Sequence, residues 1–341
     1  MSEKIKVAII GCGAIANSAH IPAYMKNEKA EIKYFCDIIP ERADAAVEKY
    51  GCGKAVYDYH EILDDPELDS VSVCTHNDLH SVIAIDFMRA GKDVLSEKPA
   101  ARVLSEALEM QRVSHETDRI LSIGVCNRFG NAVNHIKDHI NAGALGEVYR
   151  GGDSTRKAAS GGCALIDWGV HYLDLFLYCC GEPKPLTASG EAFCKLGKNI
   201  KDYVYTNMWA ENTADKDGVF DVDDSVTGIV RTDGPTITFN GAWAENIGED
   251  ETYIDFIGDK AGIRLEYGEG FVIYSVKNGM LMRSEPKFRT NNFYEAEINS
   301  FVDCVINHEH NRADIDFAIG TSKIMQAIYD SSELHREVVI D

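Results

Sequence analysis

The sequence predicts two domains, the first an α/β fold built on a doubly wound parallel sheet and the second an α+β fold with a large, mostly antiparallel open sheet. The chain has 341 residues, and at roughly 150 residues per domain this is about two domains. Short β-rich runs alternate with helical stretches up to residue 125, whereas residues 185–276 are rich in strands. We therefore expect domains over residues 1–125 and 126–341, with the last helices able to pack back on the first domain.

The first domain is expected to alternate strands and helices in regular order. Pro40 suits the first position of a helix, and Gly51 and Gly91 suit helix ends, because glycine readily adopts the left-handed conformation that closes a helix. This alternation requires right-handed crossovers and therefore a parallel sheet. The expected strands are Ile5–Ile10, Ile32–Cys36, Ser70–Thr75, Asp93–Ser96 and Ile120–Val125, and the expected helices are Pro40–Tyr50, His80–Ala90 and Ser105–Thr117.

The second domain is expected to be an antiparallel sheet accompanied by a few helices. Turn signals such as Asp233-Gly234-Pro235 separate neighbouring alternating runs without helices between them, which is typical of antiparallel strands. The expected strands are Ser225–Arg231, Thr236–Ala242, Thr252–Ile257, Phe271–Ser275 and Val338–Ile340, and the expected helices are Ala132–Ala142, Cys163–Cys180, Tyr294–Asn307 and Asp316–Leu334.

Composition excludes several classes of protein. With 34 Lys and Arg against 55 Asp and Glu, the net charge of −21 disfavours nucleic acid and anionic membranes as partners. No apolar run approaches the roughly 18 residues of a membrane span, and the first residues do not resemble a signal peptide. The ten cysteines form no CxxC pair, so neither a metal site nor a disulfide framework is expected. We expect a cytoplasmic protein with reduced thiols.

A glycine-rich turn follows the first expected strand. Gly11 and Gly13, followed by Ala14, Ile15 and Ala16, form a GxGxxA pattern that opens a helix. Such a turn lets the backbone approach a pyrophosphate at a helix N-terminus, although a tight turn without a ligand has the same pattern.

An acidic residue supports the dinucleotide interpretation. Asp37 ends the second expected strand, where a carboxylate binds the ribose hydroxyls of NAD and repels the 2′-phosphate of NADP. Arg42 follows within one helical turn and is the residue that could reach such a phosphate. We expect NAD as the cofactor.

Further candidate cofactor contacts follow the later strands of the first domain. Thr75, Asn77 and His80 come after one strand, and Asn127 comes after the last. In open α/β sheets the ligand lies at the carboxyl ends of the strands, so these side chains are candidates.

The tripeptide Glu97-Lys98-Pro99 follows another of these strands. Pro99 favours an extended backbone at Lys98, which can then project its ammonium from the sheet edge. Spacing alone favours a solvated surface lysine.

The second domain contains one polar stripe on an otherwise apolar helix. Asp167, His171 and Asp174 are spaced i, i+4 and i+7 and would share a face. A carboxylate one turn from a histidine can orient the imidazole and raise its basicity. A hydrogen-bonded core histidine is the alternative interpretation.

Together, Gly11–Ala16, Glu97-Lys98-Pro99 and Gly161-Gly162 with Asp167 and His171 resemble the Gfo/Idh/MocA family, the group of glucose–fructose oxidoreductase and inositol dehydrogenase. The resemblance extends over nearly the whole chain, with three motifs in the family's order. It implies a Rossmann domain, a second domain whose open sheet packs in an oligomer, and a bound nicotinamide cofactor. Lys98 then matches the family's active-site lysine, and Asp167 and His171 match its D-x-x-x-H element.

Two features depart from the family pattern. His76 stands where relatives often carry proline, which affects the turn before Asn77. The segment Glu147–Ser160 is shorter than the strand and substrate-side loop that the family usually has there. This shortening puts the substrate contacts and one strand of the sheet in question.

The resemblance implies an NAD-dependent oxidoreductase that oxidises a secondary hydroxyl of a sugar, inositol or glycoside, or catalyses the reverse reduction. His171 would be the base, assisted by Asp167, and Lys98 would stabilise the developing alkoxide. The alternatives are a glycosidase of the same fold that uses NAD without net redox, and a non-catalytic NAD-binding regulator. Four aromatic residues could stack on a sugar or simply pack the sheet, namely Trp168, Tyr172, Trp209 and Trp243.

A homodimer or homotetramer is also expected. The strands around residues 236–257 carry apolar residues at alternate positions of both phases, so a second apolar sheet face would need to be covered by another copy. The residues that suggest this are Ile237, Phe239, Ala242, Ile254, Phe256 and Ile257.

Overall fold

The computed structural model describes residues 4–156, 163–196, 198, 222–266 and 270–341, which form two compact units. The first unit contains Met1–Gly130 and Asn291–Ser322, and the second contains Asn131–Thr290 and Lys323–Asp341. The first unit is therefore built from two separate stretches of the chain. Among the described residues, no helix combines the length and hydropathy needed to cross a membrane.

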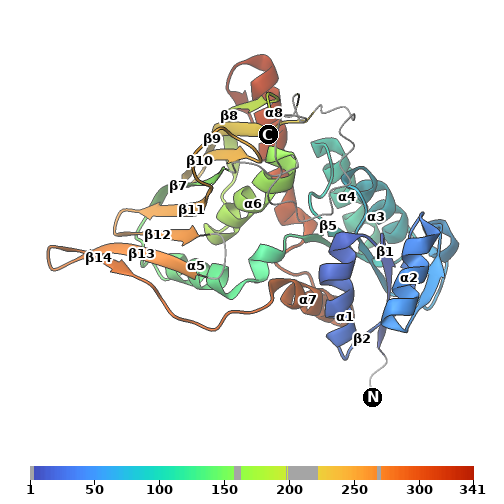
Figure 1. Ribbon diagram of the computed structural model, residues 1–341. Helices are drawn as coiled ribbons and strands as arrows, with labels where there is room; N and C mark the ends of the chain where they lie inside the picture. Colours follow the sequence, from blue (N-terminus) through green and yellow to red (C-terminus); the bar gives the residue numbers. More distant parts are fainter. Residues whose placement is uncertain (1–3, 157–162, 197, 199–221, 267–269) are drawn as a thin grey trace. The chain divides into compact units, whose positions relative to one another are not determined.

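The first unit contains a six-stranded sheet in the order β3-β2-β1-β4-β5-β6 (Figure 1). All of its neighbouring strands pair in parallel, which confirms the predicted doubly wound parallel sheet. Of the six strands only β3 was not expected, because three residues are too few to show a pattern. The strands are β1 Ile5–Ile10, β2 Ala30–Cys36, β3 Lys54–Val56, β4 Ser70–Val73, β5 Asp93–Glu97 and β6 Leu121–Gly124.

Helices cover both faces of this sheet, which is why its strands read as continuous apolar runs. Ala8 and Ile10 of β1 enter a core shared with α3 and α4, whereas Val7 and Ile9 enter a second core shared with α1 and α7. The helices are α1 Ile21–Lys26, α2 Pro40–Tyr50, α3 His80–Arg89, α4 Leu104–Thr117 and α7 Phe293–Asn307, with short helical turns η1 Ala16–His20, η2 Tyr59–Ile62, η3 Asn77–Leu79 and η4 Cys126–Phe129.

The second unit contains a nine-stranded sheet in the order β14-β13-β12-β11-β7-β10-β9-β8-β15. Its strands pair antiparallel except for β7 with β10, which run parallel, so the predicted mostly antiparallel sheet is confirmed. The strands are β7 Val148–Arg156, β8 Pro185–Phe193, β9 Ser225–Thr232, β10 Thr236–Ala242, β11 Glu251–Gly258, β12 Ala261–Glu266, β13 Gly270–Lys277, β14 Met280–Ser284 and β15 Val338–Val339.

The short segment after Gly146 keeps its strand. β7 occupies Val148–Arg156 and lies inside the sheet between β10 and β11, so the strand that the shortening put in question is present. The strand is difficult to recognise from the sequence because it contains Gly151 and Gly152, and glycine is rare in strands. Both glycines are required by close packing: a Cβ on Gly151 would lie 2.1 Å from the Phe176 ring, and one on Gly152 would lie 1.7 Å from the carbonyl oxygen of Thr238.

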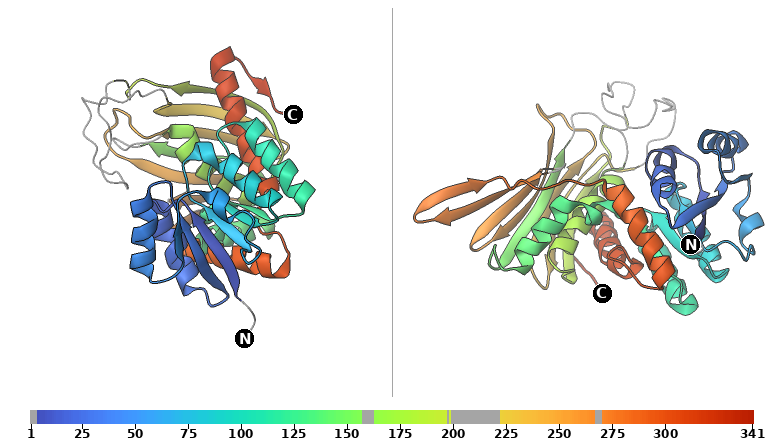
Figure 2. Two further views of the ribbon diagram at one scale, coloured as in Figure 1. Left: turned by 90° about the vertical axis from the view of Figure 1, so that its right-hand side faces the viewer. Right: turned by 90° about the horizontal axis from the view of Figure 1, so that it is seen from below.

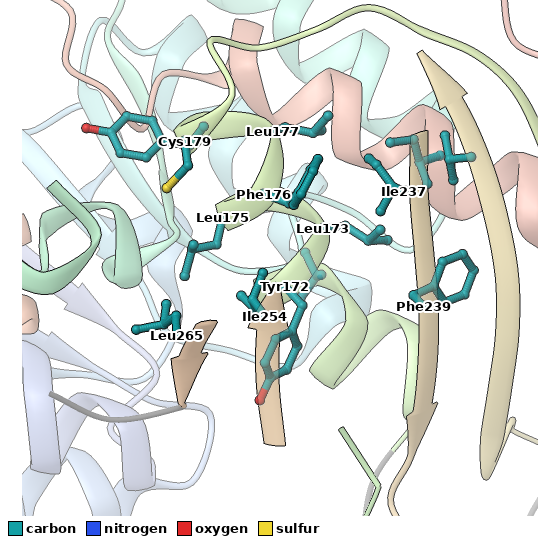
Figure 3. Close-up of a cluster of buried hydrophobic side chains, with 14 of the residues drawn as sticks. Tyr172, Leu173, Leu175, Phe176, Leu177, Cys179, Ile237, Phe239, Ile254 and Leu265 are labelled. Carbon is teal, nitrogen blue, oxygen red and sulfur yellow. The ribbon is translucent and has the colours of Figure 1, made fainter. Parts of the chain in front are cut away.

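The described helices of the second unit lie on one face of its sheet (Figure 2). They are α5 Asn131–Asn141, the π-helical turn η5 Ala164–Gly169, α6 Val170–Cys179 and the last part of α8 Ile315–Leu334. Almost all of α6 is buried, and its Phe176 stacks on Phe256 with 5.2 Å between ring centroids. Figure 3 shows side chains of α6, among them Tyr172, Leu173 and Phe176, packed beside side chains of the sheet, namely Ile237 and Phe239 of β10 and Ile254 of β11.

The expectation that both strands present apolar residues on both faces is wrong for β10. On β11, Ile257 is half-buried in the opposite phase to the buried Ile254 and Phe256. Thr238 and Asn240 are exposed on the face of β10 that the helices leave open. The other apolar residues of both strands point into the unit's own core. β10 and β11 flank β7, and their registers with β7 place these residues on the same face of the sheet. These buried residues are Ile237, Phe239, Ile254 and Phe256.

Candidate active site

The first unit places most of the candidate residues along one edge of its sheet. The chain runs from β1 outward to β3 and then returns to β4 on the other side of β1. The strand order therefore reverses between β1 and β4, where open α/β sheets bind their ligands. Because all six strands are parallel, the turns that follow them share this edge.

The turn after β1 requires glycine at its first position and leaves space at its third. Gly11 has φ +92°, and a Cβ there would lie 2.6 Å from the carbonyl oxygen of Cys74. At Gly13 a Cβ would meet no described atom within 4 Å. The turn thus packs tightly against β4 at Gly11 and stays open at Gly13, as a phosphate-binding loop must.

The loop is held by contacts to its own helix and to the neighbouring strand. The Asn17 side chain donates to the carbonyl oxygens of Cys12 at 2.9 Å and Gly13 at 3.1 Å. Ser18 donates to the carbonyl oxygen of Ala14 at 2.8 Å, one turn further along. Ala14 and Ile15 begin this helical segment, so the first N–H groups of the helix lie beside the glycines.

Asp37 joins the turns after β1 and β2. Its side chain is buried and accepts the backbone N–H groups of Cys12 and Ile39, each at 2.9 Å and each on a different carboxylate oxygen. The remaining acceptor positions of the carboxylate can bind ribose hydroxyls. Arg42 is exposed in the first turn of α2.

The turns after β4 and β5 are tied together by His80. The ring is buried, with Nδ1 at 2.8 Å from the carbonyl oxygen of Pro99 and Nε2 at 3.2 Å from that of Thr75. His76 has φ −71°, a backbone that proline also adopts, so the departure from the family pattern leaves the turn intact. Asn77 is exposed at the start of η3.

Asn127 reaches the same edge from the turn after β6. It is buried in η4, and its side-chain Nδ2 is shielded from solvent without a hydrogen-bond partner among the described residues. A buried amide donor without a partner costs free energy, so this atom suits a site that a ligand oxygen completes.

Lys98 follows β5 and is half-buried, whereas the preceding Glu97 is buried. The backbone N–H of Lys98 donates to Oε2 of Glu97 at 3.1 Å.

Asp167 and His171 lie in the second unit, at the junction of η5 and α6. Both are half-buried, and Nδ1 of His171 is shielded from solvent. Asp174 follows one turn later and is buried. The predicted helix is confirmed, but it begins with π-helical turns at Ala164–Gly169 instead of regular α-helix.

Asp223 holds the N-terminus of this helix, and the sequence analysis missed it. Its Oδ2 accepts the N–H of Leu165 at 2.7 Å, and its carbonyl oxygen accepts that of Ala164 at 3.0 Å. Its Oδ1 accepts the hydroxyl of Tyr329 at 2.8 Å. A carboxylate in this position satisfies the free N–H groups of a helix start. In the sequence, Asp223 stands out only by its neighbour Asp224. Such a pair does not show that one of them caps a helix that begins far away in the chain.

The aromatic candidates for sugar stacking are packed into the core or cannot be placed. Tyr172 and Trp243 are buried, and Trp168 is half-buried against the same core cluster. For these residues the structure favours sheet packing. Trp209 lies outside the described residues, as do Gly161 and Gly162.

The two units match two family models. The model described as the oxidoreductase family with an NAD-binding Rossmann fold matches residues 5–125, and that of the GFO/IDH/MocA C-terminal domain matches residues 133–264. The chain belongs to the Gfo/Idh/MocA family. It is therefore an NAD-dependent oxidoreductase, and the first unit is its Rossmann domain.

Three relatives of this Gfo/Idh/MocA protein are named as dehydrogenases of a D-glucoside, of levoglucosan and of myo-inositol. D-glucoside 3-dehydrogenase of Escherichia coli K12 is 28% identical, and the match covers 97% of this chain and 96% of the relative. Levoglucosan dehydrogenase of Pseudarthrobacter phenanthrenivorans is 28% identical over 67% of this chain and 65% of the relative. Myo-inositol 2-dehydrogenase of Thermotoga maritima is 29% identical over 52% of this chain and 55% of the relative.

Solved structures show the same fold. Levoglucosan dehydrogenase in complex with NADH and levoglucosan has a TM-score of 0.84 at 19% identity, covering 99% of this chain and 100% of that one. An oxidoreductase from Agrobacterium radiobacter in complex with NAD+, L-tartaric acid and magnesium has a TM-score of 0.81 at 21% identity, covering 98% of each chain.

The first unit fits NAD on its own geometry. Gly13 leaves open space beside a helix start, Asp37 offers a carboxylate at the end of β2, and the Asn127 amide lacks a partner among the described residues. In their chemistry these features suit a pyrophosphate, a ribose and a polar ligand oxygen.

We expect NAD to bind more tightly than NADP. A 2′-phosphate would lie near the Asp37 carboxylate, and like charges repel, so the two dissociation constants should differ by about 10-fold or more. Calorimetric titration of both cofactors against the purified protein measures this difference. Asp37→Asn should reduce the difference between the dissociation constants of NAD and NADP. Arg42→Ala should leave the dissociation constant of NAD unchanged. Equal or tighter binding of NADP by the unchanged protein would contradict the assignment of Asp37.

Proposed function

We propose that this protein oxidises a secondary hydroxyl of a sugar, inositol or glycoside, or catalyses the reverse reduction. The observation that carries the proposal is the end-to-end match to D-glucoside 3-dehydrogenase, which covers both units. In this protein, Lys98, Asp167 and His171 stand in the motifs that carry the resemblance to the family. When bound, NAD would accept the hydride that leaves the carbon of the alcohol.

The proposed contacts to NAD come from the first unit. The loop containing Gly11, Gly13, Ala14 and Ile15 holds the pyrophosphate, and Asp37 binds a ribose. The further proposed contacts, from the turns after the later strands, are Thr75, Asn77, Glu97, Lys98 and Asn127. His80 supports them by joining the turns after β4 and β5.

His171 is the proposed base. Its Nδ1 is shielded from solvent, so Nε2 is the nitrogen that we propose takes the proton from the substrate hydroxyl. Asp167 would orient the ring and raise its basicity. Because Asp223 fixes the start of the same helix, the backbone that carries both residues is anchored at its N-terminal end.

Lys98 is the proposed electrostatic partner in this reaction. Its ammonium would stabilise the negative charge that develops on the substrate oxygen as the proton leaves. His171 belongs to the second unit and Lys98 to the first.

A substrate panel tests the proposal. Sugars, inositols and glycosides are each incubated with the protein and NAD, and the absorbance of reduced nicotinamide is followed. A dehydrogenase accumulates NADH in proportion to ketone product. Cleavage of a glycoside without NADH accumulation would identify an NAD-using glycosidase instead. No turnover of any compound, despite NAD binding, would favour a non-catalytic regulator.

We also propose that the protein forms a homodimer or homotetramer through the open face of the second sheet. This face carries Tyr253, which contacts Arg264 at 3.8 Å from ring centroid to guanidinium, and Arg264 pairs with Asp255 at 2.7 Å. Exposed apolar residues continue on it at Tyr274 and Val276. A second copy would bury this surface.

Sedimentation velocity at micromolar concentration should give the mass of a dimer or tetramer. Val276→Glu and Tyr274→Glu should shift the protein toward the monomer, because each places a charge in the buried interface. Leu186→Glu, at the other end of the sheet, serves as a control of equal charge. A monomer for the unchanged protein would refute the proposal.

A further inference from the structure

A buried histidine and a buried glutamate contact each other at the carboxyl end of β5 in the first sheet. His20 ends η1, and its Nε2 lies 2.9 Å from Oε1 of Glu97, the last residue of β5. Its Nδ1 lies 3.3 Å from the hydroxyl of Ser72 in β4. The His20 side chain is 1% exposed and that of Glu97 9% exposed. Charged groups are buried at this level only when they are paired.

The other carboxylate oxygen of Glu97 leads directly to Lys98. Oε2 accepts the backbone N–H of Lys98 at 3.1 Å. The neighbouring strand confines the carboxyl group, since a Cβ on Gly124 would lie 3.2 Å from Cδ and from Oε1 of Glu97. A continuous chain of contacts therefore runs from the His20 ring through Glu97 to the backbone from which the Lys98 side chain leaves.

The groups packed around this pair favour a charged imidazole. Burial by itself lowers the pKa of His20, but Cys74 and Glu97 outweigh it and raise that pKa well above its ordinary value. Burial raises the pKa of the Tyr24 phenol from α1, and that of the Cys126 thiol from η4, so both stay neutral near pH 7. Lys98 and Glu297 of α7 are further charged groups near these side chains.

We propose that His20 and Glu97 are positioning residues for Lys98, and that their buried ion pair fixes the backbone that directs the Lys98 ammonium. This inference rests on the proposed function, in which Lys98 acts on the substrate oxygen. Neither side chain needs to touch the substrate. Their contribution is to hold one conformation at the end of β5, and small misplacements of a catalytic group are costly.

Two substitutions at His20 separate positioning from folding. His20→Ala removes the contact to Glu97 and should lower kcat by about 10²-fold, with little change in the dissociation constant of NAD. His20→Gln keeps an amide donor of similar reach and should recover most of that loss. His115→Gln removes an exposed histidine–carboxylate pair with Asp316, also at 2.9 Å, and should leave kcat unchanged. A purely structural role would lower the melting temperature of both His20 variants without this split in kcat.

A labelling experiment tests the positioning without any substrate. The folded protein is treated with acetic anhydride, and the acetylation rates of Lys98 and of exposed Lys54 are measured by peptide mass spectrometry. In His20→Ala the rate at Lys98 should change severalfold while that at Lys54 stays constant, and His20→Gln should lie near the unchanged protein. An unchanged Lys98 rate in both variants would overturn the inference. If Lys98 proves dispensable for turnover but its labelling still responds to His20, only the proposed function fails.

The pH dependence of stability provides an independent check on the ion pair. Because the pKa of His20 is raised in the folded state, the pair's contribution is fully present below the unfolded value of about 6.5 and is lost as pH rises through the folded value. The difference in unfolding free energy between the unchanged protein and His20→Gln should therefore shrink at alkaline pH. A difference that grows with pH would mean that the imidazole is buried neutral.

Discussion

Replacing His171 by alanine is expected to lower turnover by about 10²–10⁴-fold, because the substrate hydroxyl loses the base that accepts its proton. Lys98→Ala should cost on the order of 10²–10³-fold through loss of the cation that stabilises the developing alkoxide. The dissociation constant of NAD should change little in His171→Ala, since the proposed contacts to NAD belong to the first unit. Single-turnover formation of NADH with a substrate from the panel measures these effects.

The double variant and two controls sharpen this prediction. If both residues serve one oxygen, the loss in His171→Ala with Lys98→Ala should fall well short of the product of the single losses. Asp167→Asn should do less harm than His171→Ala, because it changes the basicity of the imidazole without removing it. His135→Ala, an exposed histidine on α5, should be neutral. Near-normal rates in both single variants with intact folds would return Lys98 and His171 to structural roles.

The two loop glycines should fail in different ways when each is changed to alanine. At Gly11 the backbone has φ +92° and a Cβ would lie 2.6 Å from the Cys74 carbonyl oxygen, so Gly11→Ala should destabilise the fold by about 1–3 kcal/mol. At Gly13 nothing described lies within 4 Å, so Gly13→Ala should keep the melting temperature. Its added methyl group would instead meet the dinucleotide, which predicts NAD binding weaker by about 10- to 100-fold.

Thermal unfolding and NAD titration of the two variants give this comparison. Gly51→Ala is a useful control, because Gly51 has φ +66° with no described atom near its Cβ position, so it isolates the backbone cost. Full NAD affinity in Gly13→Ala would show that the pyrophosphate does not approach this residue.

Local patterns predicted the first unit well because its buried strands are short apolar runs that alternate in regular order with helical stretches. β1 at Ile5–Ile10 and α2 at Pro40–Tyr50 have the predicted bounds, and the left-handed Gly51 ends α2 as expected. The second unit was predicted less completely. β7 was missed because Gly151 and Gly152 carry no β signal, and only their packing against Phe176 and Thr238 explains them.

The sequence by itself determined the family motifs, the parallel sheet and the candidate residues at its carboxyl edge, because each can be recognised from local patterns, namely motif spacing, the alternation of strands and helices, and the residues that follow each strand. Tertiary structure decided which polar groups support those candidates. His20 meets Glu97 from another strand, and Asp223 caps a helix whose start lies 58 residues away at Leu165. Neither pairing follows from a periodic pattern in the sequence, because the partners come from distant parts of the chain. Leaving a buried charge without its partner costs free energy through desolvation, so the fold brings the two together. In the same way, only the registers of β10 and β11 with β7 show that Ile237, Phe239, Ile254 and Phe256 lie on one face of the sheet and enter one core.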